Sequence, residues 1–184
     1  MKCLVYTIAL ASCFSFVQCK KDKPSKNLPP VTQEGKNTVG FKVNGEIWTP
    51  FYKCSYSGDP CGEISARYGP PYNSTDWFSF QVARSTSDHL SALTISSLTP
   101  ITTIGDKFDS ITINYLTGNG SNLGTSYNKT YQSSRTFDIT RIDIVNQIIS
   151  GVFSFKLFNT SGGTDSIEIT DGRFDFRMNA CICR

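Results

Sequence analysis

The chain of 184 residues is poor in charge and in histidine, and both shortages limit its functions. Charged residues make up 18% of the chain, below the ~25% usual in globular domains. The single histidine, His89, excludes a metal site built from several histidines of one chain. The net charge is +3, and both signs are interspersed after residue 36, which excludes the extended basic face that binds nucleic acid. We therefore expect no nucleic-acid partner, no cofactor and no metal.

Motifs of catalysis and of helical assemblies are also missing. The sequence has no Gly-x-Ser-x-Gly elbow, and His89 lies at a loop-to-strand junction, which is typical of an exposed turn histidine. The glycine-rich segment 118–124 lacks the G-x-G-x-x-G spacing of a phosphate loop. No segment after residue 20 carries an apolar repeat of 3.6 residues over three turns. No catalytic residue is therefore assigned.

The first 18 residues have the pattern of a secretory signal. Lys2 precedes an apolar run over 3–17, whose ~15 residues fall short of the ~20 needed to span a bilayer as a helix. Cys19 follows this run and opens a charged stretch, Cys-Lys-Lys-Asp-Lys, which is the position that bacterial lipoproteins acylate. Cys13 is the alternative, because small residues precede it, whereas Gln18 precedes Cys19. We expect an outer-membrane lipoprotein, with periplasmic and surface orientations both open.

The remaining chain divides into a linker and one domain. Residues 19–38 contain three prolines and five lysines without hydrophobic periodicity, which predicts a flexible tether. From residue 39 to 184 the pattern is that of β-strands, so a single all-β domain is expected there. Strands are predicted at 39–43, 46–52, 64–68, 77–83, 90–96, 108–115, 126–131, 136–145, 148–158 and 166–178.

Alternation within these strands predicts an antiparallel sheet with one buried and one wet face. In 152–158 the residues Phe153, Phe155 and Leu157 share one face. In the last strand Phe174, Phe176 and Met178 oppose a polar face of Arg173, Asp175 and Arg177. The fold class is therefore an antiparallel β-sandwich, with a partly closed up-and-down β-barrel as the alternative.

Three local signals refine this pattern. Asn44-Gly45 predicts a tight hairpin, because both residues tolerate positive φ. A change of phase near Thr140-Arg141 predicts a β-bulge. A second change at Asp171-Gly172 also favours a bulge, with a tight turn as the alternative.

Four cysteines follow the tether, which is an even number in an oxidising compartment. Cys181 and Cys183 are separated by one residue, which fits disulfide geometry poorly in an extended strand. We therefore expect the tail cysteines to bridge to Cys54 and Cys61. A four-thiolate zinc site is the alternative, but the spacing does not match compact structural zinc motifs.

The aromatic residues of the segment 68–77 suggest a ligand surface. Tyr68, Tyr72 and Trp77 lie in and around a Pro-Pro loop beside Asn and Asp. Flat rings of this kind stack on the apolar faces of sugars, although Tyr68 and Trp77 could equally point into the core. These three residues are the candidate glycan-binding aromatics.

Two segments resemble a known set of proteins. Residues 37–48, Asn-Thr-Val-Gly-Phe-Lys-Val-Asn-Gly-Glu-Ile-Trp, resemble the opening of a family of small Bacteroidota-type cell-envelope lipoproteins of uncharacterised function. Residues 148–155 and 169–175 resemble the closing strands of the same family. The resemblance implies an all-β domain and a cell-envelope location, and it supplies no catalytic residue.

The sequence therefore predicts a lipid-anchored envelope protein that acts as a non-catalytic binding or structural module. The expected partners are the membrane, through the N-terminal lipid, and a glycan or an envelope protein. The alternative is a small hydrolase that acts on an envelope or dietary polymer. Two carboxylates about 5–9 Å apart in a cleft would favour that alternative.

Overall fold

A computed structural model describes residues 23–51, 63–69, 77–119, 124–130, 135–162 and 164–182. The proposed signal, the lipidation sites Cys13 and Cys19, and Tyr72, Cys54, Cys61 and Cys183 lie outside these residues. The described elements follow in chain order: β1 (Thr38–Val43), β2 (Glu46–Trp48), β3 (Ile64–Tyr68), β4 (Phe78–Ser85), β5 (His89–Ser97), β6 (Gly105–Asp106), the 3₁₀ turn η1 (Phe108–Ser110), β7 (Ile111–Asn119), β8 (Thr125–Asn128), β9 (Arg135–Asp143), β10 (Ile148–Asn159), β11 (Ser166–Arg177) and β12 (Cys181–Ile182).

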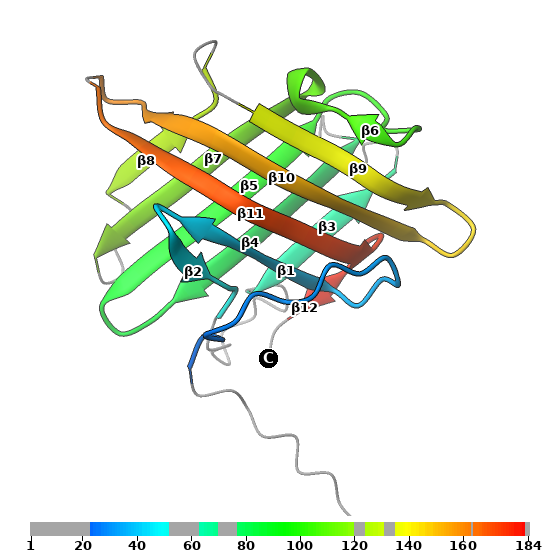
Figure 1. Cartoon of the computed structure of the whole chain (residues 1–184), viewed down its shortest axis with the longest axis horizontal. Helices are drawn as coiled ribbons and strands as arrows, with labels where there is room; N and C mark the ends of the chain where they lie inside the picture. Colours follow the sequence, from blue (N-terminus) through cyan, green and yellow to red (C-terminus); the bar gives the residue numbers. More distant parts are fainter. Residues whose placement is uncertain are drawn as a thin grey trace, which may run out of the picture.

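These strands form one curled antiparallel sheet. The strand order is β12-β3-β4-β5-β7-β8-β10-β11-β1-β2, and β9 pairs with β10 on the edge that β10 also shares with β8. The sheet folds over so that β9, β10, β11, β1 and β2 lie in front of β3, β4, β5 and β7 (Figure 1). The predicted all-β antiparallel fold is confirmed. Its two facing layers are halves of a single sheet, which gives the molecule the form of a half-barrel.

Phenylalanine side chains fill the space between the layers. Phe174 of β11 lies 5.3 Å from Phe80 of β4 and 5.6 Å from Phe137 of β9, measured between ring centroids. All three rings are buried. The contact of Phe174 with Phe80 joins the front layer to the back layer, whereas that with Phe137 lies within the front layer. The alternation predicted for β4 and β11 places Phe80 and Phe174 on the buried face.

The three local signals predicted from the sequence are all present. Asn44 and Gly45 have φ of 49° and 85° and join β1 to β2. Ser150 pairs with Arg141 and Gly151 pairs with Ile139, so Thr140 is the extra residue of a bulge. The 171–172 pair is also a bulge, since β11 runs through it as one strand.

Two strand predictions need correction. Residues 108–110 form η1 instead of the start of a strand, because the Asp106 carboxylate accepts a hydrogen bond from the Phe108 N–H at 3.0 Å and turns the chain. The second strand ends at Trp48 and not at residue 52. Pro50 follows closely, and proline has no N–H to donate to a ladder.

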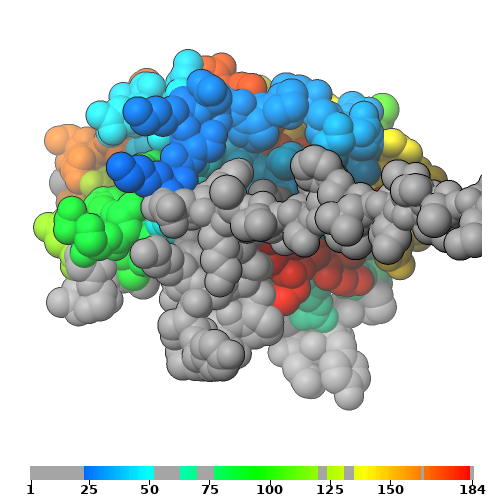
Figure 2. All heavy atoms as spheres, turned by 90° about the horizontal axis from the view of Figure 1, so that it is seen from below, coloured from blue at the N-terminus to red at the C-terminus, as the bar shows by residue number. Residues whose placement is uncertain are grey.

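The N-terminal segment predicted as a flexible tether is docked on the sheet from residue 25 onward. Thr49 Oγ1 donates to the carbonyl of Ser25, and Arg173 donates to the carbonyl of Pro29. Pro29 also fills the space over Gly40, where an added Cβ would lie 2.5 Å from Pro29 Cδ. Residues 23–50 therefore form one side of the molecule, blue to cyan in Figure 2.

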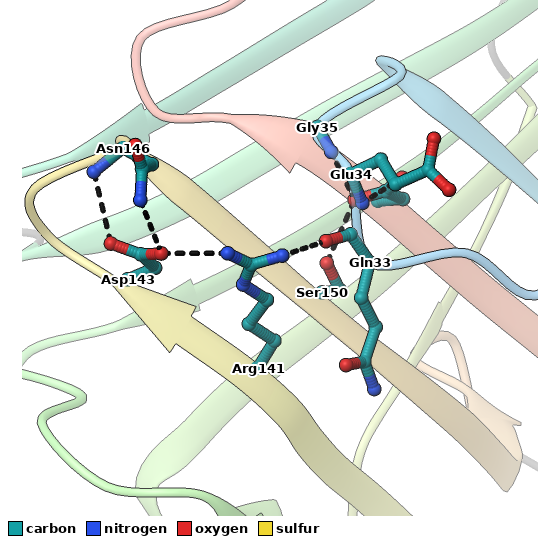
Figure 3. A network of polar contacts seen from close by, with 8 residues as sticks. Gln33, Glu34, Gly35, Arg141, Asp143, Asn146 and Ser150 are labelled. Carbon is teal, nitrogen blue, oxygen red and sulfur yellow. Dashed lines mark hydrogen bonds and ion pairs between the residues drawn. The ribbon is translucent and has the colours of Figure 1, made fainter.

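Asp175 fixes the end of this segment. The sequence places Asp175 on the wet face of β11, but its side chain is buried because residues 32–36 cover it. Arg141 donates to the carbonyl of Gln33 and pairs with Asp143 at 2.7 Å, which ties the same segment to β9 (Figure 3).

Candidate functional site

An open cavity of about 630 Å³ lies at one end of the curled sheet, between the β1–β2 hairpin and the facing strands. Its size falls in the ~300–1,000 Å³ range of small-molecule sites. Its lining comes from β4, β5, β7 and β8, together with β1, β2 and β11. The described lining is Val43, Asn44, Glu46, Ile47, Trp48, Arg84, Thr86, His89, Ser91, Tyr115, Thr117, Tyr127 and Ile167.

Strand phase explains why polar residues line this cavity. Phe78, Phe80 and Val82 of β4 point to the core, and Arg84 continues the same face by a period of two. In β7, Ile111 and Ile113 point inward and are followed on that face by Tyr115. The inward-facing residues of β4 and β7 thus change from apolar to polar toward one end of the molecule. The cavity opens at that end, next to the apolar core.

The base of the cavity is a buried hydrogen-bonded group. Trp48 Nε1 donates to Ser91 Oγ at 2.9 Å, and both side chains are buried. The Trp48 ring stacks on Phe41 with 4.4 Å between centroids, so it is held rigidly. Burial raises the pKa of Tyr115, while hydrogen bonds with Ser91 and Trp48 and the charge of Arg84 oppose that rise. All four residues line the cavity.

Arg84 contributes a half-buried cation to the wall. Its Nη1 donates to the carbonyl of Ile47 at 3.3 Å, which ties β4 to the edge strand β2. The four ion pairs found among the described residues use Lys36, Lys42, Arg135 and Arg141, and none of them includes Arg84. A guanidinium has five N–H donors, and the hydrogen bond to the Ile47 carbonyl uses one of them.

The rim is polar. His89 Nε2 and Thr117 Oγ1 are 3.0 Å apart, which joins the ends of β5 and β7. Tyr127 donates its hydroxyl proton to Asp165 Oδ2 at 2.8 Å. This hydrogen bond and, to a smaller extent, burial raise the pKa of Tyr127. The hydroxyls and the imidazole at the rim can both donate and accept hydrogen bonds.

Tyr68 and Trp77, two of the three aromatic residues predicted from the sequence, are not among the residues that line this cavity. Tyr68 donates its hydroxyl proton to the Ile101 carbonyl at 2.7 Å and packs against the core, and burial raises its pKa. Trp77 immediately precedes β4, and its backbone bonds to Gly69 and Ser97. Tyr72 lies outside the described residues, so a surface formed by all three aromatics stays a prediction.

Sequence reasoning missed the cavity because it gave these residues only separate local roles, in strands, in the hairpin turn at Asn44 and in the turn at His89. Trp48 was part of the motif that carries the family resemblance, and Tyr115 was part of a predicted strand. These residues could have been found by following the buried face of each predicted strand, every second residue, past its last apolar residue. Arg84 on the face of Phe80 and Val82 is the clearest case.

Neither the comparison with protein-family models nor searches of the curated proteins and the solved structures returned a match. The resemblance to envelope lipoproteins therefore stays a prediction. Within the residues that the structure describes, no helix is long and apolar enough to cross a membrane. The same residues contain no group of three or more His, Cys, Asp or Glu side chains placed to hold a metal ion.

Proposed function

We propose that this chain is an exported, lipid-anchored binding protein of the bacterial outer membrane, and that its ligand is a saccharide held in the cavity between the β1–β2 hairpin and β5 and β7. The observation that carries the proposal is the cavity itself. It combines a rigid aromatic base, formed by Trp48 and Tyr115, with hydroxyl, imidazole and guanidinium groups on its walls.

This combination suits a sugar. Binding sites for small molecules pair apolar and aromatic surface with a few fixed polar groups. Sugars present an apolar ring face and many hydroxyls, and the Thr117–His89 pair at the rim offers donors and acceptors to such hydroxyls. The signal-like residues 1–18 and Cys19 support the location at the outer membrane.

The hydrolase alternative has less support. Glycosidases of the common kind use two carboxylates that flank the scissile bond. Among the described lining residues, Glu46 is the single carboxylate, and it is exposed on the edge strand β2. His89 contacts Thr117 rather than Ser91, so these residues do not form a nucleophile-base pair. We therefore favour binding without catalysis.

Tryptophan fluorescence tests the proposal. The chain has two tryptophans, so a Trp77→Phe variant leaves Trp48 as the sole reporter at the base of the cavity. We expect saturable changes in its emission when the purified full-length chain, in detergent, is titrated with members of a panel of neutral and acidic saccharides. A Thr117→Trp variant, which narrows the mouth, should weaken that binding as measured by calorimetry. Absence of saturable binding across the panel would contradict the proposal.

A further inference from the structure

Arg84 is a cation on the inward face of a core strand. Its neighbours on that face, Val82 and Phe80, are completely buried, and Arg84 itself is half-buried. Arginine keeps its charge in proteins, and a charge removed from water normally has an ionic partner. The described contact of the Arg84 guanidinium is with the neutral carbonyl of Ile47. The cavity thus contains positive charge without a carboxylate of the described chain paired to it.

We propose that the ligand of this cavity is an acidic saccharide, and that Arg84 binds its carboxylate. This inference rests on the proposed function and specifies the class of sugar. The planar fork of a guanidinium matches the two oxygens of a carboxylate, which is why arginine is preferred where such groups are recognised.

The other charges of the cavity agree with this assignment. Glu46 is the single acidic side chain of the described lining, and it lies outside ion-pair distance of Arg84. Glu46 is exposed to solvent at the edge of the sheet, where screening weakens its field. Arg84 is half-buried and donates to the Ile47 carbonyl, so it is the less exposed of the two charges and decides the charge of the group that enters there.

The groups around Arg84 suit the rest of a sugar acid. Arg84, Tyr115, Ser91 and Trp48 all line this cavity, and Trp48 Nε1 donates to Ser91 Oγ at 2.9 Å. The charge of Arg84 opposes the rise in the pKa of Tyr115. A carboxylate on Arg84 would therefore place its attached ring beside the Tyr115 and Trp48 rings. His89 and Thr117 at the rim are then within the part of the cavity that the ring hydroxyls face.

The test compares two disaccharides that differ in one group. One carries a terminal glucuronic acid, and the other carries glucose in its place, so that a carboxylate is exchanged for a CH₂OH group. Calorimetry on the purified full-length chain in detergent should give at least about tenfold tighter binding of the acid, the size expected for hydrogen bonds to a charged group. Raising the salt concentration should reduce this preference.

Variants of Arg84 identify the group responsible. Arg84→Met keeps most of the side-chain length and should abolish the preference for the acid, so that the ratio of the two affinities falls to about one. Arg84→Lys keeps the charge without the fork and should leave part of the preference. Arg135→Gln is the matched control, because Arg135 pairs with Asp109 outside the cavity, and it should change neither affinity. Thermal unfolding of each variant confirms that it is folded.

The outcomes separate the two proposals. Equal binding of both sugars by the wild type, unchanged in Arg84→Met, would overturn the assignment of an acidic ligand and leave saccharide binding intact. Tighter binding of a sulfated disaccharide than of the glucuronic acid form would overturn the choice of a carboxylate. Absence of binding of any saccharide in the panel would overturn the proposed function together with this inference.

Discussion

The carboxylate of Asp175 accepts a hydrogen bond from the backbone N–H of Gly35, with 2.8 Å between Oδ1 and N, although 140 positions separate the two residues. The same carboxylate accepts from Thr32 Oγ1 at 2.6 Å and from Ser150 Oγ at 2.8 Å. Two further backbone N–H groups, of Glu34 and Lys36, complete the shell. The Asp175 side chain therefore binds residues 32–36 of the N-terminal segment to β11. Figure 3 shows Ser150, Glu34 and Gly35, three of the residues that donate to it, close together.

The first prediction concerns the stability that this shell supplies. Asp175→Asn removes the charge and two acceptor positions, so buried N–H and O–H donors lose partners. We expect the free energy of unfolding to fall by about 2–3 kcal/mol, measured by urea denaturation. Asp109→Asn is the control, because Asp109 forms an exposed ion pair with Arg135, and a change within about 0.5 kcal/mol is expected. Equal losses in the two variants would contradict the role of Asp175.

The second prediction concerns pH. Burial by itself raises the pKa of Asp175, but hydrogen bonds from Thr32, Ser150 and the backbone outweigh it, and the pKa lies below its ordinary value of 3.8. A carboxyl group with a lowered pKa binds protons more readily in the unfolded chain, so its contribution is complete above that ordinary value and declines as the pH falls below it.

Unfolding curves between pH 7 and pH 2.5 test this dependence. The pKa values of Asp143 and Asp171 are also lowered, by Asn146 and by Lys42 respectively, so the wild-type curve contains more than one group. The difference between the wild type and Asp175→Asn isolates Asp175. This difference should be constant above about pH 5 and should shrink below about pH 4. A difference that stays constant down to pH 2.5 would show that folding leaves the pKa of Asp175 unchanged.

Alternation was sufficient to predict the longer strands and both bulges, because one buried face imposes a period of two on every strand. It did not reveal the two-residue strands β6 and β12. It was not sufficient for Asp175. A wet face is defined locally as the face without apolar residues, and whether another segment covers that face depends on contacts distant in sequence. Residues 32–36 have no hydrophobic pattern from which their packing against β11 could be predicted. Three of their contacts with Asp175 are made by backbone N–H groups, which every residue type except proline has.

The same limit applies to the cavity. The sequence shows that Trp48, Arg84 and Tyr115 are near strand ends, and their phase places them inward. Their convergence requires the sheet to curl so that β2 faces β5 and β7, and the curl is set by packing between the halves. The aromatic loop around Tyr68 was conspicuous in the sequence, yet Tyr68 completes a hydrogen bond with Ile101 at the edge of the core.

The third prediction concerns the bulge in β11. Gly172 lies against the Phe153 ring, and a Cβ on Gly172 would be 2.3 Å from Phe153 Cδ2. Phe153 is buried and stacks on Phe155, so it has little room to move. We expect Gly172→Ala to lower the free energy of unfolding by about 2–3 kcal/mol. Gly124→Ala is the control, because its Cβ would meet ordinary contact distances, and near-wild-type stability is expected there.

The fourth prediction concerns the lipid anchor. Cys19 follows the apolar run and precedes a charged stretch, so it is the residue expected to be acylated. Metabolic labelling with a fatty acid should mark the wild type in the membrane fraction, and Cys19→Ala should lose the label and retain residues 1–18. Cys13→Ala should be labelled as the wild type is. The reverse result in the two variants would move the cleavage site to Cys13.

The last prediction concerns the C-terminal tail. Cys181 belongs to β12, which pairs with β3 through Ser65, and the Ile182 carbonyl accepts from the Glu63 N–H at 3.1 Å. The start of β3 lies three positions after Cys61, so the pairing brings the tail to the segment that holds two of the four cysteines. A two-residue strand at a chain end has few contacts of its own, and a covalent link to a neighbouring segment would keep it from fraying.

We therefore expect non-reducing peptide mapping of the exported protein to show Cys181 or Cys183 linked to Cys54 or Cys61. Such a bridge closes a loop of roughly 120–130 residues, for which the chain-entropy estimate is ~4–5 kcal/mol. Reduction should lower the unfolding temperature, and the variant with all four cysteines replaced by serine should unfold at the reduced temperature under both conditions. A Cys54–Cys61 link with free tail thiols, or thiols protected by zinc, would contradict the bridge, because β12 would then rest on β3 through backbone hydrogen bonds alone.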